Sequence, residues 1–284
     1  MRWLLTLLLC SGLWLPSLVA MAEPLRLPER QGQSAEQVIT DLAKAQVVYL
    51  GETHDSVEDH RAQLEILEQL YQRQPRLAIG LEMFQRPFQP QLDRYRRGEI
   101  TLEQLRQLSE YDQRWGFDWQ LIVPILEFAR QHNLPLIALN APIELTRMVA
   151  RQGLAAVSPE LRGQLPREIQ VDRDGPYRAW LQRSFEAHAP NTRRSAAFTN
   201  FLTAQILWDE TMAETVADTV RAQPQGLVVV LAGSSHIAYG FGIPSRVARR
   251  LPDVRQRSVL LSVGAVPDLP QPVSQSVADY LWRP

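Results

Sequence analysis

Residues 227–236 have the sequence LVVVLAGSSH, six apolar residues followed at once by Gly-x-x-His. The same order occurs near the other end of the chain, where residues 47–55 have the sequence VVYLGETHD. A short run of apolar and β-branched residues that ends at a glycine is typical of a strand buried on both faces, as in a parallel sheet. These two segments therefore predict parallel strands that each carry a histidine just beyond their carboxyl ends.

A third apolar run, LAIGL at 77–81, ends in Glu82, and residues 56–74 before it have helical spacing. Further strands are predicted at 134–139 and 258–263. A strand, a helix and a second strand in this order favour a right-handed crossover between parallel strands. The predicted fold class is therefore α/β, with a mostly parallel central sheet flanked by helices.

Two long segments between predicted strands, at about 87–131 and 142–223, are predicted to be helical insertions. The longest single helix is expected at 195–221, and the proline-rich tail from residue 267 is expected to be irregular. Such insertions can form a helical subdomain that caps the carboxyl edge of the sheet, where open α/β sheets bind ligands. We interpret residues 23–284 as a single α/β domain of this kind.

Four polar side chains are predicted to meet at this edge: Glu52, His54, Glu82 and His236. Imidazoles and carboxylates together suit zinc, manganese or iron with open coordination positions, so all four are candidate ligands of a divalent metal ion. The same four could instead act catalytically, as a base with its orienting partners. Histidines that only cap turns are the plain structural alternative.

Aromatic residues indicate a second kind of ligand. Four aromatic side chains between residues 111 and 119 can stack on a flat apolar molecule, or can simply pack within the helical cap. Tyr177, Tyr239 and His188 are candidate haem-binding residues, because a phenolate or an imidazole can ligate haem iron. Ordinary packing with a bonded polar atom is the alternative for each of the three.

Further polar residues have less specific interpretations. His60 is expected on the exposed face of the helix over 56–74. Asp209 and Glu210 lie inside the longest predicted helix, where they can reach the site or form a salt bridge with an arginine such as Arg246. A solvated acidic face is the alternative for both carboxylates.

The first residues predict a secretory signal peptide. Arg2 precedes an apolar stretch, and AMA at 20–22 is a small-x-small cleavage pattern, which assigns residues 1–22 to the signal with cleavage after Ala22. An uncleaved membrane anchor is the alternative, but the apolar stretch is short for a spanning helix. Cys10 is the only cysteine, and the residues before it do not favour lipoprotein anchoring. We therefore expect an exported, periplasmic protein.

Composition narrows the class of ligand. The formal net charge is −1, from 30 Lys and Arg against 31 Asp and Glu, so nothing indicates a nucleic-acid partner. The sequence also contains no phosphate-binding loop, no dinucleotide fingerprint and no Gly-x-Ser-x-Gly elbow.

Four segments carry a resemblance to a known family: VYLGETHD at 48–55, GLEMF at 80–84, AQILWDETMA at 204–213 and AGSSH at 232–236. In this order they resemble the ChaN-like haem-binding uptake family, which belongs to the Tiki and erythromycin-esterase-like superfamily. The resemblance extends roughly from Ala45 to Val263, which is nearly the whole chain after the predicted signal.

The resemblance implies an α/β core with a helical subdomain, and a role in haem or iron acquisition with haem as the ligand. It also implies an outer-membrane haem or iron receptor system as a partner, and a homodimer that holds haem between two subunits. Superfamily relatives include metal-dependent proteases and esterases, whose site residues correspond by position to His54, Glu82 and His236, with Glu52 beside the first. The predicted function is an exported haem- or iron-binding protein, with a metal-dependent hydrolase as the alternative.

Overall fold

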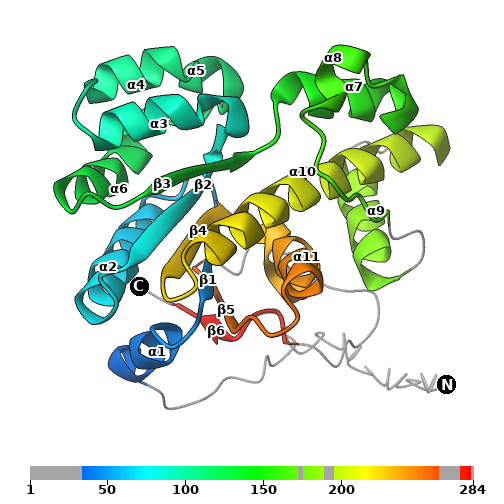
Figure 1. Ribbon diagram of the computed structural model, residues 1–284. Coiled ribbons are helices and arrows are strands. Elements are labelled where there is room, and N and C mark those ends of the chain that lie inside the picture. The colour runs from blue at the N-terminus through cyan, green and yellow to red at the C-terminus, as the bar shows by residue number, and fades with distance from the viewer. Residues whose placement is uncertain (1–33, 172–174, 189–194, 262–275, 283–284) are drawn as a thin grey trace, which may run out of the picture.

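The computed structural model describes residues 34–171, 175–188, 195–261 and 276–282, and its centre is one six-stranded sheet (Figure 1). All neighbouring strands are parallel, in the order β3-β2-β4-β1-β5-β6. This confirms the α/β class predicted from the apolar runs. The strands are β1 (Val47–Glu52), β2 (Leu77–Gln85), β3 (Leu136–Asn140), β4 (Leu227–Gly233), β5 (Gln256–Leu260) and β6 (Tyr280–Leu281).

The three central strands are apolar because both of their faces are covered. Every residue of β1, β2 and β4 is buried. The strand β4 lies between β1 and β2, and its register places Gly233 beside Glu52 and Leu231 beside Leu81. Two segments about 180 positions apart therefore end side by side, and this adjacency creates the site.

Helices cover the two faces of the sheet. On one face α1 (Ala35–Leu42), α2 (Val57–Arg73) and α6 (Trp119–Gln131) join the larger apolar core. On the other face α10 (Ser195–Ala222) and α11 (Ile243–Arg250) form a second core with β1 and β4. The result is a three-layer α/β/α arrangement, in which the long diagonal α10 crosses the sheet (Figure 1).

The remaining helices form the cap at the carboxyl edge of the sheet (Figure 1). Between β2 and β3 lie α3 (Gln89–Arg96), α4 (Leu102–Leu108) and α5 (Tyr111–Arg114). Between β3 and β4 lie α7 (Ile143–Gln152), α8 (Pro159–Arg162) and α9 (Pro176–His188). Each predicted insertion thus supplies helices of the cap and, in addition, one helix that flanks the sheet, which is α6 in the first insertion and α10 in the second. The flanking helix packs against the sheet because it is amphipathic and leads back to the next strand.

Local sequence signals place several boundaries well. Ser34 caps α1 through a capping box with Gln37, and Ser56 caps α2. The predicted helix over 195–221 is observed as Ser195–Ala222. The prediction of an irregular tail is wrong at Tyr280–Leu281, which pair with β5 as a sixth strand.

No helix among the described residues is both long enough and apolar enough to span a membrane. The predicted signal peptide and its cleavage position lie outside the described residues.

Candidate functional site at the carboxyl edge of the sheet

The two Gly-x-x-His motifs meet over Gly233. A β-carbon at this position would lie 2.8 Å from Cε1 and 2.9 Å from Nε2 of His54, and 3.7 Å from Oε2 of Glu82. The glycine has an ordinary negative φ of −56°, so it is required for this close approach and not for its backbone conformation. The chain then turns through the short 3-10 helix Ser234–His236, which returns His236 toward the same edge.

Glu52 and His54 form the first carboxylate–imidazole pair. Nδ1 of His54 lies 2.9 Å from Oε1 of Glu52, and the carboxylate is buried. Burial lowers the pKa of His54, but the hydrogen bond to Glu52 and the charges of Glu82 and Glu52 outweigh burial, and the net pKa is raised. Glu52 therefore orients the imidazole and favours its protonated form.

The helix α2 holds Glu52 from behind. Nε2 of Gln63 donates to Oε2 of Glu52 over 2.6 Å, and Nδ1 of His60 lies 3.9 Å from the same oxygen. His60 is buried, so the prediction that it lies on the exposed face of α2 is wrong. His60 and Gln63 share one helical stripe with Leu67, because positions three and four apart lie on the same face.

Glu82 and His236 form the second pair. Nε2 of His236 lies 3.4 Å from Oε1 of Glu82, whose Oε2 accepts a hydrogen bond of 2.7 Å from the amide of Gly233. Burial raises the pKa of Glu82, but the charge of His236 and the hydrogen bonds to Glu82 lower it to about 2. Glu82 does not end its strand as predicted, because β2 continues to Gln85.

His236 also binds Asp209 on the long helix α10. Its Nδ1 lies 2.7 Å from Oδ1 of Asp209. Burial lowers the pKa of His236, but the charge of Glu82 and the hydrogen bond to Asp209 raise it to about 10. An imidazolium clamped between two carboxylates is the form that this geometry stabilises. Both interpretations of Asp209 are observed, since it also forms an ion pair with Arg246, with Nη1 3.8 Å from Oδ2. Glu210 likewise forms an ion pair with Arg246, with Nε 3.6 Å from Oε1. Both carboxylates are buried, so the alternative of a solvated acidic face is wrong.

Tyr177 extends this chain of hydrogen bonds from α9. Its buried hydroxyl donates to Oδ2 of Asp209 over 2.5 Å. Burial and the charge of Asp209 raise the pKa of the Tyr177 phenol well above its ordinary value. In this arrangement the hydroxyl is directed at a carboxylate and away from solvent.

The other predicted haem-binding residues lie elsewhere. Tyr239 is buried in the second core, stacks on Phe241 with ring centroids 5.5 Å apart, and has a positive φ of 56°. His188 is the last residue of α9, and its side chain lies outside the described part of the structure.

Aromatic side chains surround the exposed part of His54. The ring centroid of His54 lies 4.7 Å from that of Trp115 and 4.9 Å from that of Phe117. Phe117 is 37% exposed, and the side chain of His54 is 26% exposed. We call these three residues the His54 face.

The carboxylates at the edge are occupied by hydrogen bonds from the protein itself. Glu52 accepts from Gln63 and pairs with His54, and Glu82 accepts from the Gly233 amide. Within residues 34–171, 175–188, 195–261 and 276–282, no three His, Cys, Asp or Glu side chains are grouped so as to hold a metal ion. Metal binding by Glu52, His54, Glu82 and His236 stays a prediction.

Sequence reasoning missed the support behind Glu52 and the acceptor role of Glu82 toward a backbone amide. The spacing of His60, Gln63 and Leu67 was a signal for the first, since it places polar side chains on the buried stripe of α2. No local pattern could reveal the amide of Gly233, because this contact joins positions 151 residues apart.

Fold and site together define an α/β protein whose parallel sheet carries two carboxylate–imidazole pairs at its carboxyl edge. The family model described as "Haem-binding uptake, Tiki superfamily, ChaN" matches residues 38–247, and the chain belongs to this family.

Similar proteins include two solved structures and one curated sequence. The structure titled "Cofacial heme binding to ChaN of Campylobacter jejuni" has a TM-score of 0.67 and 20% identity, covering 83% of this chain and 88% of that one. A mutant of the erythromycin esterase EreC in its open conformation has a TM-score of 0.49 and 16% identity, covering 88% and 81%. The chloroplastic protein RETICULATA-RELATED 5 of Arabidopsis thaliana is 28% identical over 278 residues, which are 90% of this chain. The chain spans only 36% of that relative's length.

Proposed function

We propose that this protein binds haem and that the His54 face is where haem lies. Membership of a haem-binding uptake family over residues 38–247 is the observation that carries the proposal. The His54 face supports the location, because it combines an imidazole with two aromatic side chains that are partly open to solvent.

The residues of this face fit the chemistry of haem. A porphyrin is flat and apolar, and it packs well against aromatic rings such as those of Trp115 and Phe117. Haem iron accepts an imidazole ligand, and a ligating histidine typically has its other ring nitrogen held by a carboxylate, as Glu52 holds Nδ1 of His54. Tyr177 and Tyr239 fit less well in this arrangement, because both are buried.

An absorbance titration with haem tests the location. We expect the double substitution Trp115→Ala and Phe117→Ala to weaken haem binding by about tenfold or more, since stacked aromatic contacts supply much of the affinity at such a face. Leu108→Ala is the matched control, because Leu108 is also an exposed apolar residue, 44% exposed, and lies on α4. Equal haem affinity in the double variant and in the control would contradict this location.

We further propose that the protein is exported and takes part in haem or iron uptake. In this role it would act with an outer-membrane receptor system and would be a homodimer. The signal-like residues 1–22 support export, and the family description supports uptake. Expression of the full chain in a Gram-negative host, followed by cell fractionation and mass spectrometry, tests export. We expect a periplasmic product that begins at Glu23, and an intact cytoplasmic chain would contradict the proposal.

A metal-dependent hydrolase is the second candidate function. The observation that favours it is the pair of carboxylate-oriented imidazoles, His54 on Glu52 and His236 on Asp209, which is an arrangement suited to acid–base chemistry. Hydrolysis of activated esters, assayed with added manganese or zinc, tests it. Turnover that is lost in His54→Ala would support this candidate, and a rate equal to the buffer rate would reject it for esters.

A further inference from the structure

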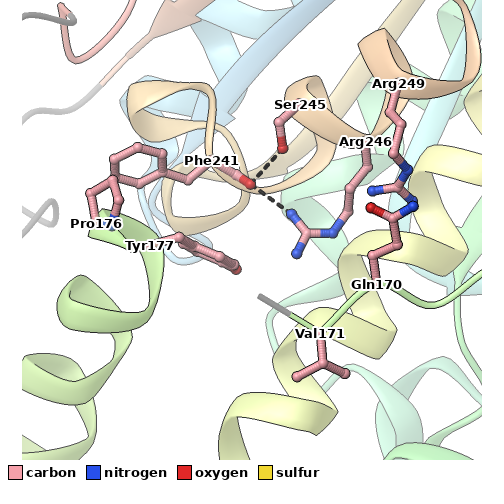
Figure 2. A pocket seen from close by; sticks show the side chains of 8 residues that line it. All are labelled: Gln170, Val171, Pro176, Tyr177, Phe241, Ser245, Arg246 and Arg249. Atoms are coloured by element: carbon pink, nitrogen blue, oxygen red, sulfur yellow. Dashed lines mark hydrogen bonds between the residues drawn. The ribbon is translucent and has the colours of Figure 1, made fainter. Parts of the chain in front are cut away.

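A pocket of about 410 Å³ opens between α9 and α11 (Figure 2). One wall is apolar and aromatic, formed by Pro176, Tyr177 and Phe241. The opposite wall is polar and carries Arg246 and Arg249 of α11. A volume of this size suits a small organic molecule.

Arg246 lies at the centre of this pocket. Its guanidinium is directed between Tyr177 and Gln170 (Figure 2) and lies 5.2 Å from the centroid of the Tyr177 ring. The residue is only 4% exposed. Its Nη1 donates to the carbonyl oxygens of Phe241 and Gly242, at 2.6 Å and 2.9 Å.

The rest of the Arg246 guanidinium makes no hydrogen bond within the described residues: Nε has no partner, and the hydrogen bonds of this side chain all start from Nη1. Arg246 forms ion pairs with two carboxylates at distances too long for hydrogen bonds: Oε1 of Glu210 lies 3.6 Å from Nε, and Oδ2 of Asp209 lies 3.8 Å from Nη1. A buried guanidinium is costly when its donors remain unpaired.

Both neighbouring carboxylates are taken up by other donors. Asp209 accepts from Tyr177 and pairs with His236. Glu210 accepts from Arg249 at 2.7 Å and pairs with Arg250 at 2.7 Å. Arg246 therefore retains donors for a ligand, and Nε of Arg249 on the same wall is also without a hydrogen-bond partner among the described residues.

We propose that this pocket binds a small organic carboxylate with an apolar or aromatic body. The carboxylate is recognised by Arg246, because a guanidinium binds a carboxylate in planar, charge-assisted geometry. The apolar body lies against Tyr177 and Phe241, which have ring centroids 5.9 Å apart. This site uses none of the residues of the His54 face, so it is independent of the proposed haem site.

Benzoate is the probe that tests the proposal, with benzamide as its neutral analogue of similar shape and inorganic phosphate as a simple anion. Isothermal titration of the purified full chain is expected to show saturable binding of benzoate. The affinities for benzamide and for phosphate are each expected to be lower than the affinity for benzoate by about tenfold or more. Equal affinity for benzoate and benzamide, or for benzoate and phosphate, would overturn the proposed ligand class.

Two variants locate the binding. Arg246→Gln removes the charge and should weaken benzoate binding by about tenfold or more. Because a change at a buried arginine can disturb folding, Ser245→Trp provides the second variant: Ser245 is an exposed residue of the same wall, and a large ring there would obstruct the pocket. Arg147→Gln on α7 is the control, since Arg147 is exposed and does not line the pocket.

We expect Ser245→Trp to lose benzoate binding while it keeps the thermal unfolding midpoint and the haem absorbance of the unchanged protein. Arg147→Gln should bind benzoate normally. Unchanged benzoate affinity in a folded Ser245→Trp variant would show that benzoate binds elsewhere and would overturn the proposal.

Discussion

At the residue scale, Gly233 determines whether the two histidine motifs can share one site. The imidazole of His54 occupies the space where any other residue would place its β-carbon, 2.8 Å from Cε1. The amide of the same glycine donates to Glu82, which in turn faces His236. One position thus fixes the distance between the two carboxylate–imidazole pairs.

Gly233→Ala should displace His54 and lower the free energy of unfolding by about 1–3 kcal/mol, because overpacking forces neighbouring groups to shift. Urea unfolding followed by circular dichroism measures this change. Gly163→Ala is the control, since a β-carbon at Gly163 meets no atom within 4 Å. Equal stability of the two variants would show that His54 does not need this space.

The imidazolium of His236 predicts a loss of stability at alkaline pH. Its folded-state pKa of about 10 lies above the ordinary value of 6.5, so its contribution is complete below about pH 6.5 and is lost as the pH rises through about 10. We expect the free energy of unfolding to fall by an amount on the order of 5 kcal/mol across this window. His236→Gln should flatten the alkaline decline, whereas His132→Gln should keep it.

The lowered pKa of Glu82 predicts a loss of stability at acid pH. Its folded-state pKa of about 2 lies below the ordinary value of 4.5, so its contribution is present above about pH 4.5 and is lost as the pH falls toward 2. Because the charge of His236 helps to depress this pKa, His236→Gln should also reduce the acid dependence. An unchanged acid limb in that variant would contradict the coupling of the two residues.

At the element scale, β6 is a two-residue strand at the edge of the sheet, which pairs with β5 and is also held by side-chain hydrogen bonds. The hydroxyl of Tyr280 donates to Oδ2 of Asp41 over 2.7 Å, and Nε of Arg257 donates to the same oxygen over 2.7 Å. These contacts join the last strand to the C-terminal turn of α1 and to β5. The pKa of Asp41 is lowered mainly by the hydrogen bond from Arg257 and, to a smaller extent, by the hydrogen bond from Tyr280.

Tyr280→Phe should lower the free energy of unfolding by about 1 kcal/mol, because it removes one hydrogen bond to a charged acceptor and keeps the ring. Tyr71→Phe is the matched control, since Tyr71 packs against the same core and makes no hydrogen bond through its hydroxyl among the described residues. Guanidinium unfolding measures both. Identical midpoints for the two variants would show that the contact with Asp41 contributes nothing.

The sequence predicted the elements whose signals are local. Apolar periodicity located α2 and α10, and apolar runs located β1, β2 and β4. The strand β6 was not predicted because two residues are too few to show a periodic pattern of apolar side chains. Their pairing also depends on β5, some 20 positions earlier. The burial of His60 was not predicted for a related reason. His60 lies on the polar stripe of α2 that faces Glu52, and this partner is brought close only in the folded sheet.

At the scale of the whole molecule, the predicted meeting of Glu52, His54, Glu82 and His236 at one edge follows from topology. Strands β1, β2 and β4 are neighbours and parallel, so their carboxyl ends lie together. The sequence could not show how these residues pair with Gln63, Asp209 and the Gly233 amide, since those contacts depend on the packing of α2 and α10. It also could not show the pocket beside Arg246, whose walls come from α9 and α11.

Haem binding at the His54 face is the central claim, and an absorbance titration of haem into the unchanged protein and into His54→Ala tests it most directly. We predict a saturable Soret shift for the unchanged protein and, for His54→Ala, a changed Soret spectrum with affinity reduced by about tenfold or more. His132→Ala should behave as the unchanged protein does. A Soret shift that is identical in His54→Ala but lost in Tyr177→Phe or Tyr239→Phe would move the iron ligand to that tyrosine and contradict the account. The absence of any saturable shift would reject haem binding itself.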